Sequence, residues 1–418
     1  MNSPLLPGSR IGVAGAGQLG RMMAIAARQM GYVVHVLTNT DDAPAEQVAD
    51  HVTCGHFSDL DLWREFARQV DVVTYETESL PLDGMLAVAE IVPVRPGMEL
   101  LRLSQHRMRE KSWLRDHGLP VPEFFPVATR QQFQHALDEF AQHGVLKTTA
   151  GGYDGKGQWL MRQPADVVAA WNDVGPQLID EHPHPDRHRS LSHSHAQAAG
   201  TPPVVPPPLD APFILERLVD YQLEFSVIGA RSAAGEFATY GPMLNVHQNH
   251  ILDLSVCPAG IPERAAVDSR AMVRAIAEQL DVVGLFCVEF FLTRDDDVLI
   301  NEIAPRPHNS GHLTIEAHVV SQFEQQVRTV CGLPLGSTRQ LSPAAMVNLL
   351  GDLWLTGPLA WDAALPPQGH LHLYGKRTAL AGRKMGHLTV LAESADEART
   401  AALASRHALT FRTAVRNS

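Results

Sequence analysis

The sequence predicts an α/β domain at the N-terminus, followed by a strand-rich α+β domain and a small C-terminal unit of short strands. Three observations support this fold class. Apolar runs alternate with helical patterns in the first quarter of the chain, later runs pair across short turns, and two more runs, HLHLYGK and KMGHLTVLA, follow Leu341. Strands that alternate with helices indicate a parallel sheet, and strands joined by short turns indicate hairpins.

Length and composition narrow the class of protein. The chain has 418 residues, a net charge of −12 and 45% hydrophobic residues, so we expect two or three soluble domains. The negative charge disfavours nucleic acid as a partner, and no window approaches the run of about 18 apolar residues that a membrane helix needs. The N-terminus has no signal-peptide pattern, and the cysteines (Cys54, Cys257, Cys287 and Cys331) are scattered. We therefore expect a cytoplasmic protein with reduced thiols.

The order of patterns along the chain predicts its organisation. Strands are expected at 11–14, 33–37, 52–54, 72–75, 145–147, 158–161, 213–215, 224–228, 287–293 and 298–303. Helices are expected at 21–30 and near 62–69. HGLPVPEFF, from His117 to Phe125, contains two prolines and a glycine and connects to a new unit. We expect domains at 1–105, 106–340 and 341–418, with a lid at about 120–225.

A glycine-rich turn follows the first strand. GVAGAGQLGRMM contains Gly15, Gly17 and Gly20 in the spacing G-x-G-x-x-G, which is typical of a turn that binds a dinucleotide pyrophosphate at a helix N-terminus. An NAD site also needs an acidic residue that ends the second strand. That strand ends in Val36-Leu37-Thr38, and Asp41 lies beyond it in a polar turn. We therefore expect a phosphate-bearing ligand other than NAD.

An acidic hairpin carries the strongest local signal. CVEFFLTRDDDVLINEIAPR has two strand-like runs around the turn RDDD. If the turn is centred between Asp295 and Asp296, Glu289 lies opposite Glu302, and opposed residues have Cβ atoms about 4.5–5.5 Å apart. Two carboxylates that close repel each other by roughly 4 kcal/mol at an effective dielectric of 20. The pair fits Mg²⁺ bound with a nucleotide; the alternative is two exposed glutamates on a surface hairpin.

Two further segments fit a nucleotide. VLKTTAGGYDGKGQWLM is a glycine hairpin bracketed by Lys147 and Lys156. It lacks the G-K-[ST] of a Walker A loop but can fold over phosphates through its backbone N–H groups; the alternative is a flexible hairpin without special function. In ILERLVDYQLEFSVIG, Glu216 and Glu224 end two apolar runs. They are candidates for binding an adenine amine and ribose hydroxyls.

One segment has the composition of a surface insertion. From Pro183 to Pro212 the chain is dense in Pro, His, Ser and Ala, with little that a core could bury. Its histidines have no metal-ligand spacing, so we expect a disordered, solvated linker.

Taken in order, these segments resemble the ATP-grasp enzymes, and within them the N5-carboxyaminoimidazole ribonucleotide synthetase family. The most specific words are GQLGRM, GGYDGKGQ, NEIAPRPHNSGH and GRKMGH. The resemblance implies an ATP-grasp fold with an N-terminal Rossmann-like (pre-ATP-grasp) domain. It also implies ATP- and bicarbonate-dependent carboxylation of 5-aminoimidazole ribonucleotide through carboxyphosphate, with Mg²⁺. A cytoplasmic homodimer, whose product passes to N5-carboxyaminoimidazole ribonucleotide mutase in purine biosynthesis, is further implied.

The resemblance assigns roles to individual residues. The implied ATP-binding residues are Arg107, Lys147, Gly152, Tyr153, Asp154, Gly155, Lys156, Gly157, Gln158, Glu216, Arg217, Leu218, Val219, Glu224, His247, Asn301 and Glu302. The implied metal ligands are Glu289 and Glu302. The implied ribonucleotide-binding residues are Gln18, Leu19, Glu76, Arg383 and Lys384. The implied catalytic residues are Arg306, His308, Lys384 and Tyr153.

The chain departs from the family pattern in two places. YETES, from Tyr75 to Ser79, stands where family members commonly have Phe and Asn, and the Pro183–Pro212 insertion is additional. Two alternatives stay open at this point. One is an ATP-grasp ligase with another acceptor, and the other is a nicotinamide-dependent oxidoreductase that uses the Gly15–Gly20 turn.

Overall fold

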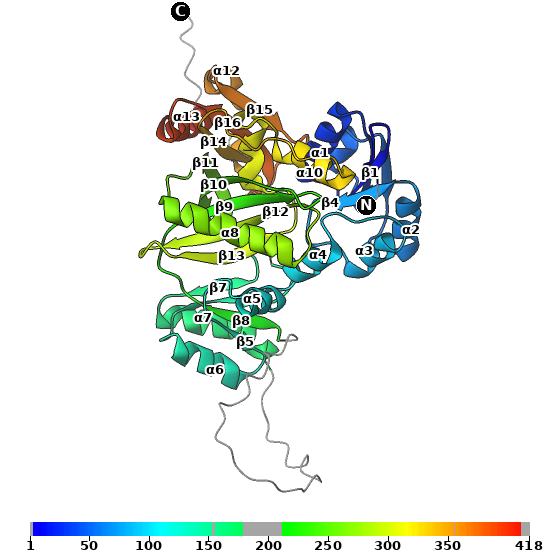
Figure 1. Cartoon of the computed structure of the whole chain (residues 1–418). Coiled ribbons are helices and arrows are strands. Elements are labelled where there is room, and N and C mark those ends of the chain that lie inside the picture. Colours follow the sequence, from blue (N-terminus) through cyan, green and yellow to red (C-terminus); the bar gives the residue numbers. More distant parts are fainter. Residues whose placement is uncertain (1–2, 153–154, 179–210, 356, 411–418) are drawn as a thin grey trace, which may run out of the picture. The chain divides into compact units, whose positions relative to one another are not determined.

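The computed structural model describes residues 3–152, 155–178, 211–355 and 357–410. Tyr153, Asp154 and all but the last two residues of the expected insertion at 183–212 lie outside the described residues. The chain forms two compact units. Figure 1 shows the chain coloured by residue number. The larger consists of Met1–Gln105 and Asp220–Ser418, and the smaller of His106–Val219. No helix among the described residues is long and apolar enough to cross a bilayer.

A parallel sheet forms the N-terminal part of the larger unit, as the sequence predicts. Its strand order is β3-β2-β1-β4, and β1 and β4 have nearly continuous burial because helices cover both faces. The apolar residues of α1 (Gln18–Gln29) and α10 (Gln322–Cys331) pack on one face. Those of α2 (Leu60–Arg68) and α3 (Leu82–Ala89) pack on the other. The strands are β1 (Arg10–Ala14), β2 (Val33–Thr38), β3 (His51–Cys54) and β4 (Val72–Tyr75).

An eight-stranded sheet forms the rest of this unit. Its order is β13-β12-β9-β10-β11-β14-β16-β15, and every neighbouring pair is antiparallel. The strands are β9 (Tyr221–Arg231), β10 (Phe237–Gln248), β11 (Ile251–Cys257), β12 (Gly284–Thr293), β13 (Val298–Ala304), β14 (Ala344–Leu350), β15 (Gly369–Leu373) and β16 (Lys384–Leu391). The last three strands therefore extend the central sheet, since β14 pairs with β11.

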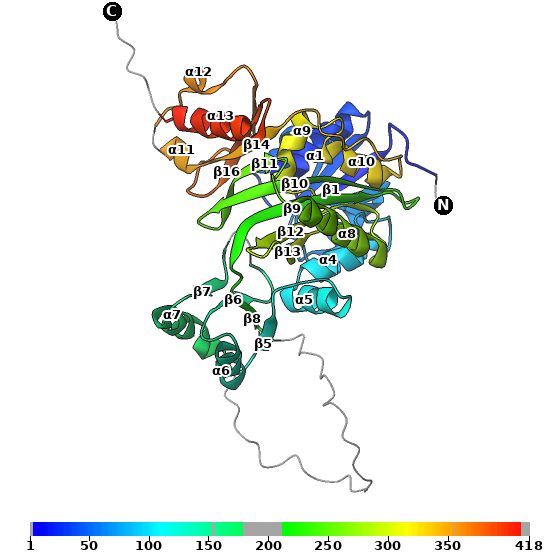
Figure 2. The same cartoon turned by 60° about the vertical axis from the view of Figure 1, so that its left-hand side comes forward.

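Helices and 3-10 turns complete the larger unit. Helix α8 packs against β9, β10, β12 and β13, and α13 packs against β11, β14 and β16 (Figure 2). The helices are α1 (Gln18–Gln29), α2 (Leu60–Arg68), α3 (Leu82–Ala89), α4 (Met98–Ser104), α8 (Glu263–Gln279), α9 (Thr314–Ala317), α10 (Gln322–Cys331), α11 (Asp352–Leu355), α12 (Trp361–Ala364) and α13 (Ala395–Ala408). The 3-10 turns are η1 (Pro44–Gln47) and η3 (Asn309–Leu313).

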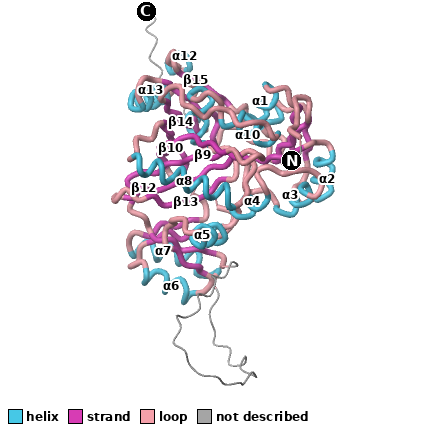
Figure 3. Tube along the Cα trace, in the orientation of Figure 1, coloured by secondary structure: helices cyan, strands magenta, loops and turns pink. Residues whose placement is uncertain are grey.

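The smaller unit is an antiparallel sheet covered by two helices. The strand order is β5-β8-β6-β7, and the helices α6 and α7 lie beside these strands (Figure 3). The apolar side chains of both helices are buried against the sheet. The elements are α5 (Arg107–Asp116), β5 (Phe124–Val127), α6 (Arg130–Glu139), β6 (Gly144–Thr148), β7 (Gln158–Met161), α7 (Pro164–Val174), η2 (Gly175–Gln177) and β8 (Phe213–Arg217). The predicted α/β and α+β class is confirmed.

Candidate active site

The acidic hairpin places its two glutamates opposite each other. Glu289 of β12 pairs with Glu302 of β13, which confirms the predicted register. Next to the turn, however, Leu292 pairs with Val298, so the turn is centred on Asp295 and not between Asp295 and Asp296. The register shifts between Glu289 and Phe290, because Asn301 is an extra residue in β13. This one-residue bulge offsets the half-residue error and restores the pair.

The two carboxylates have different surroundings. Glu289 is buried and Glu302 is exposed, so a ligand from solvent can reach the pair on the side of Glu302. His308 Nε2 lies 2.8 Å from Glu289 Oε1, and Ser310 Oγ lies 2.8 Å from His308 Nδ1. Burial alone would raise the pKa of Glu289, but the charge and hydrogen bond of His308 lower it. Cys287 and Glu289 in turn raise the pKa of His308 against the effect of burial.

A second carboxylate–histidine pair lies close by. Glu224 of β9 and His247 of β10 approach to 2.6 Å between Oε2 and Nδ1. Burial lowers the pKa of His247, but the Glu224 hydrogen bond and the charge of Glu289 raise it overall. The larger unit therefore brings Glu224, His247, Glu289 and His308 together, although 84 residues separate the first from the last in the chain.

Arg306 directly follows this hairpin and is held by a residue that the sequence reasoning missed. Its Nε lies 2.5 Å from Glu78 Oε2, and its Nη2 lies 3.0 Å from Oε1. The pair raises the already high pKa of Arg306 against the effect of burial. Arg306 is thus fixed by Glu78, and His308 by Glu289 of the acidic pair itself.

The glycine turn binds a carboxylate of its own chain. The Gly17 N–H donates to Glu76 Oε1, and the Gly20 N–H donates to Oε2 over 2.7 Å. A Cβ on Gly15 or Gly17 would lie 2.6 or 2.7 Å from Glu76 atoms, so these glycines make room for Glu76. These two donors were expected to bind a ligand phosphate. In the structure both donors bind the Glu76 carboxylate.

Cations from the segment between β15 and the start of β16 gather near this turn. Lys376 Nζ donates to Gln18 Oε1 over 2.9 Å and to the Lys384 carbonyl over 2.6 Å. Arg383 Nη2 lies 3.3 Å from Asp42 Oδ2. Burial, reinforced by Arg383, lowers the pKa of Lys376 to about 8. The structure therefore brings Gln18, Arg383 and Lys384 together and adds Lys376.

Leu19 has a different position from its neighbour Gln18. Its side chain is buried in the core formed by α1, β1 and β2. Any contact of Leu19 with a ligand must therefore use its backbone.

In the smaller unit, Glu216 is the centre of a buried charge cluster. Its Oε2 lies 2.8 Å from Lys147 Nζ and 3.8 Å from Lys111 Nζ. Burial alone would raise the pKa of Glu216, but the charges of Lys111 and Lys147 lower it. Lys147 is a predicted site residue, whereas Lys111 is not, because a lysine in a polar helix usually faces solvent.

The glycine hairpin of this unit is tied down at its base. Arg107 donates from Nη1 to the Thr148 carbonyl and from Nη2 to the Gly152 carbonyl, over 3.0 and 3.1 Å. Thr148 N–H donates to Gly157 O over 2.8 Å. Gly155 and Gly157 have positive φ angles, 78° and 68°, which favour glycine. Lys156 and Gln158 complete the described part of the hairpin.

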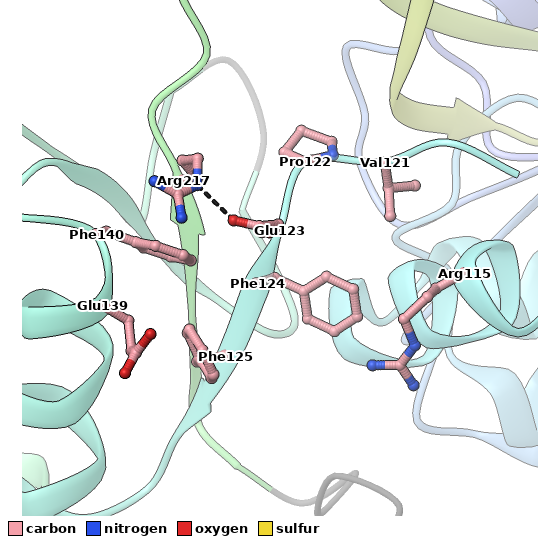
Figure 4. Close-up of a pocket in the computed structure, with 9 residues that line it drawn as sticks. All are labelled: Arg115, Val121, Pro122, Glu123, Phe124, Phe125, Glu139, Phe140 and Arg217. Atoms are coloured by element: carbon pink, nitrogen blue, oxygen red, sulfur yellow. Dashed lines mark hydrogen bonds and ion pairs between the residues drawn. The ribbon is translucent and has the colours of Figure 1, made fainter. Parts of the chain in front are cut away.

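Arg217 faces a separate cavity. Its Nε lies 2.5 Å from Glu123 Oε2, and its guanidinium lies 4.6 Å from the Phe140 ring centre (Figure 4). The cavity, of about 310 Å³, is lined by Arg115, Val121, Pro122, Glu123, Phe124, Phe125, Glu139, Phe140 and Arg217. Glu216 is buried while Arg217 is exposed, since successive side chains of β8 point to opposite faces. The Arg217 side chain therefore points away from the Glu216 cluster; Leu218 and Val219 follow it beyond β8.

Family models match three consecutive parts of the chain. A ribonucleotide synthetase pre-ATP-grasp domain matches residues 9–105. An ATP-grasp domain matches residues 112–182 and 195–323. A phosphoribosylaminoimidazole carboxylase C-terminal domain matches residues 344–401.

Full-length relatives agree with these models. The N5-carboxyaminoimidazole ribonucleotide synthase of Bacillus subtilis is 38% identical over 393 residues, which cover 94% of each chain. The chain belongs to the N5-carboxyaminoimidazole ribonucleotide synthase family. A synthase from Pseudomonas aeruginosa is 37% identical and covers 91% of this chain and 94% of its own.

Solved structures of the synthase family share the fold. A synthetase crystallised as an ADP complex has a TM-score of 0.85 at 38% identity and covers 98% of both chains. An Aspergillus clavatus synthase in complex with ADP and 5-aminoimidazole ribonucleotide has a TM-score of 0.81 at 27% identity. That match covers 96% of this chain and 99% of the other.

The Glu216 cluster gives a first prediction. Glu216→Gln keeps the shape of the side chain but leaves Lys111 and Lys147 without the charge between them. Removing one partner of a buried ion pair costs about 3–5 kcal/mol. We expect a loss of this size in the stability of the smaller unit, measured by native-state hydrogen exchange of the amides of β6 and β8.

The matched control is Glu123→Gln. Its ion pair with Arg217 is largely exposed, with 67% and 49% of the two side chains accessible, and exposed pairs contribute about 1 kcal/mol or less. Equal losses in the two variants would contradict the buried cluster.

Proposed function

We propose that this chain catalyses the ATP- and bicarbonate-dependent carboxylation of 5-aminoimidazole ribonucleotide. The products would be N5-carboxyaminoimidazole ribonucleotide, ADP and phosphate. Relatives of nearly equal length are named for this synthase activity, and one related structure is described with ADP and 5-aminoimidazole ribonucleotide. The chain is accordingly an ATP-dependent ligase.

One observation of the structure carries the proposal. The larger unit holds an acidic pair, Glu289 and Glu302, beside Arg306 and His308. It also gathers three cations, Lys376, Arg383 and Lys384, through contacts with Gln18, with Asp42 and with one another's backbone. The first group suits the transfer of a phosphoryl group to an anion. The second suits an acceptor that carries a phosphate.

The acidic pair fits a divalent metal, which we take to be Mg²⁺. In the described part of the chain no cluster of three or more His, Cys, Asp and Glu residues has metal-binding geometry. Glu289 and Glu302 would therefore hold the ion while nucleotide and water oxygens fill its other positions, as Mg²⁺ prefers. Bound there, it would neutralise charge on the transferred phosphoryl group.

The chemistry explains why ATP is needed. Bicarbonate is a poor electrophile, and its phosphorylation gives carboxyphosphate and ADP. The acceptor amine then forms a bond to the carboxyl carbon, either directly or after release of CO₂, and phosphate leaves. Arg306 and protonated His308 would stabilise the anionic intermediate, because donors fixed in advance need no reorganisation.

The cation group favours a ribonucleotide over other acceptors. Lysine and arginine donors are the usual partners of phosphate oxygens, and Gln18 orients Lys376 toward the turn. A nicotinamide oxidoreductase is disfavoured because Glu76 occupies the donors that a pyrophosphate would need. An ATP-grasp ligase with another phosphorylated acceptor is the remaining alternative.

The same proposal covers the setting of the reaction. We propose a cytoplasmic homodimer whose product passes to N5-carboxyaminoimidazole ribonucleotide mutase. The resemblance supports this setting, as do the four free cysteines, because disulfides are rare in a reducing cytoplasm.

Release of ADP tests the function directly. We expect ADP formation by the full chain to require both bicarbonate and 5-aminoimidazole ribonucleotide, with one carboxylated product for each ADP. Equal turnover with 5-aminoimidazole ribonucleotide omitted, or with another phosphorylated amine, would favour the alternative ligase.

Glu302→Gln tests the metal site. We expect turnover to fall at least about a hundredfold, since one of two metal ligands loses its charge. The melting temperature without ligand should change little, because Glu302 is exposed. The rise in melting temperature caused by Mg·ATP should shrink, because it depends on affinity for the folded state. Asp295→Asn, at the exposed tip of the same hairpin, is the control and should behave as wild type.

Lys376 predicts a dependence on pH. With its pKa lowered to about 8, Lys376 is charged below pH 8 and loses its proton as the pH rises. If the cation binds the phosphate, the KM for the ribonucleotide should rise roughly fivefold between pH 8 and pH 9, while the KM for ATP stays constant. Lys376→Arg remains charged over this range and should flatten the profile. The same slope in wild type and variant would exclude Lys376 as the titrating group.

A further inference from the structure

The Glu78–Arg306 ion pair joins two distant segments of the larger unit. Glu78 follows β4 of the parallel sheet, and Arg306 follows β13 of the eight-stranded sheet, 228 residues later. Two parallel contacts, of 2.5 and 3.0 Å, join the carboxylate to the Nε and Nη2 edge of the guanidinium. A two-point contact of this kind fixes the plane and direction of an arginine, which a single contact does not.

Further hydrogen bonds hold both Glu78 and Arg306 in place. Gln105 Nε2 donates to the carbonyls of Glu78 and Leu80 over 2.9 and 2.7 Å, which anchors the loop that carries the carboxylate. Arg306 Nη1 donates to the Pro307 carbonyl over 3.3 Å. The side chains of Glu78 and Arg306 are only 27% and 18% exposed, so water competes little for their contact.

The segment that carries Glu78 also contacts the glycine turn at the start of α1. Glu76, two residues before Glu78, binds the Gly17 and Gly20 N–H groups and thereby fixes the turn that carries Gln18. Glu76 also lies within electrostatic range of both Arg306 and Lys376. The segment 76–78 thus contacts both Arg306 and the glycine turn that carries Gln18.

We propose that Glu78 is a positioning residue that sets the Arg306 guanidinium and so couples ATP cleavage to carboxylation. This inference rests on the proposed function. Because Glu78 occupies the Nε and Nη2 edge, Arg306 meets the bicarbonate-derived anion with its remaining donors and in one orientation. That orientation holds carboxyphosphate toward the acceptor amine, which the glycine turn bound by Glu76 positions.

Loss of Glu78 leaves the guanidinium free to turn about its side-chain bonds. Carboxyphosphate then still forms from ATP and bicarbonate but is held less well against the amine. Water attacks it instead, giving bicarbonate and phosphate, so that the net reaction is hydrolysis of ATP. The expected signature is ADP without an equal amount of carboxylated product.

The test compares Glu78→Gln with wild type in a coupled assay of ADP and of carboxylated ribonucleotide. We expect the product-to-ADP ratio to fall at least threefold and the carboxylation rate at least tenfold, with the KM for ATP within twofold of wild type. Glu78→Asp retains the charge and should recover a large part of the ratio. Glu324→Gln removes the carboxylate from a pair with Arg328 on α10 and serves as the matched control.

A double-mutant cycle separates positioning from a general structural effect. If Glu78 acts through Arg306, Glu78→Gln should change the ratio less than 1.5-fold in the background of Arg306→Lys. Equal effects in both backgrounds, or a ratio near one in Glu78→Gln, would overturn the inference. Should Glu78→Gln fail to fold, the cycle is run with Gln105→Ala, which frees the loop that carries Glu78, and the same two outcomes decide. Failure of the proposed function is distinguishable, since wild type itself would then show no ADP release dependent on ribonucleotide.

Discussion

A carboxylate that is shielded from water needs hydrogen-bond donors or cations beside it, and in this structure those partners come from other segments of the chain. A buried ion without a partner costs several kcal/mol, a large share of the stability of a domain. Four glutamates meet the requirement with donors that are distant in sequence: Glu76 with the α1 turn, Glu78 with Arg306, Glu216 with two lysines, and Glu289 with His308. Each of these contacts also fixes a residue that the proposed reaction uses.

The α1 turn shows how the same constraint changes the meaning of a motif. Glycines in the spacing G-x-G-x-x-G expose backbone N–H groups at a helix N-terminus, where any anion is stabilised. Here the anion is Glu76, and the close approach of its carboxylate explains why Gly15 and Gly17 carry no Cβ. The motif therefore fixes the start of α1, while the Gln18 side chain is held by Lys376; in the proposed reaction the phosphate of the acceptor would meet the cations near Lys376.

The sequence predicted those features that depend on residues close together in the chain. Alternation of apolar runs predicted the parallel sheet, and the symmetry of a hairpin predicted the Glu289–Glu302 pair, although a bulge at Asn301 compensated for the misplaced turn centre. Strand β10 was missed, since its Gly241–Pro242 step interrupts the alternation and shifts the register. Glu78, Lys111 and Lys376 were missed for another reason. Their partners Arg306, Glu216 and Gln18 lie 105 to 358 residues away, and no periodicity records which distant side chain each will contact.

The strand order separates the acidic pair from Lys384, and the segment that follows β13 connects them. In the eight-stranded sheet, β12 and β16 are five strands apart, which at about 4.8 Å per strand places Lys384 roughly 24 Å from Glu289 along the sheet. The segment that follows β13 crosses this distance, because its 3-10 turn η3 contacts β10, β11, β14 and β16. His312 within it lies in electrostatic range of both Arg306 and Lys384. Arg306 and His308 begin this segment, so one stretch of chain, and not neighbouring strands, connects the acidic pair with the cations around Lys384.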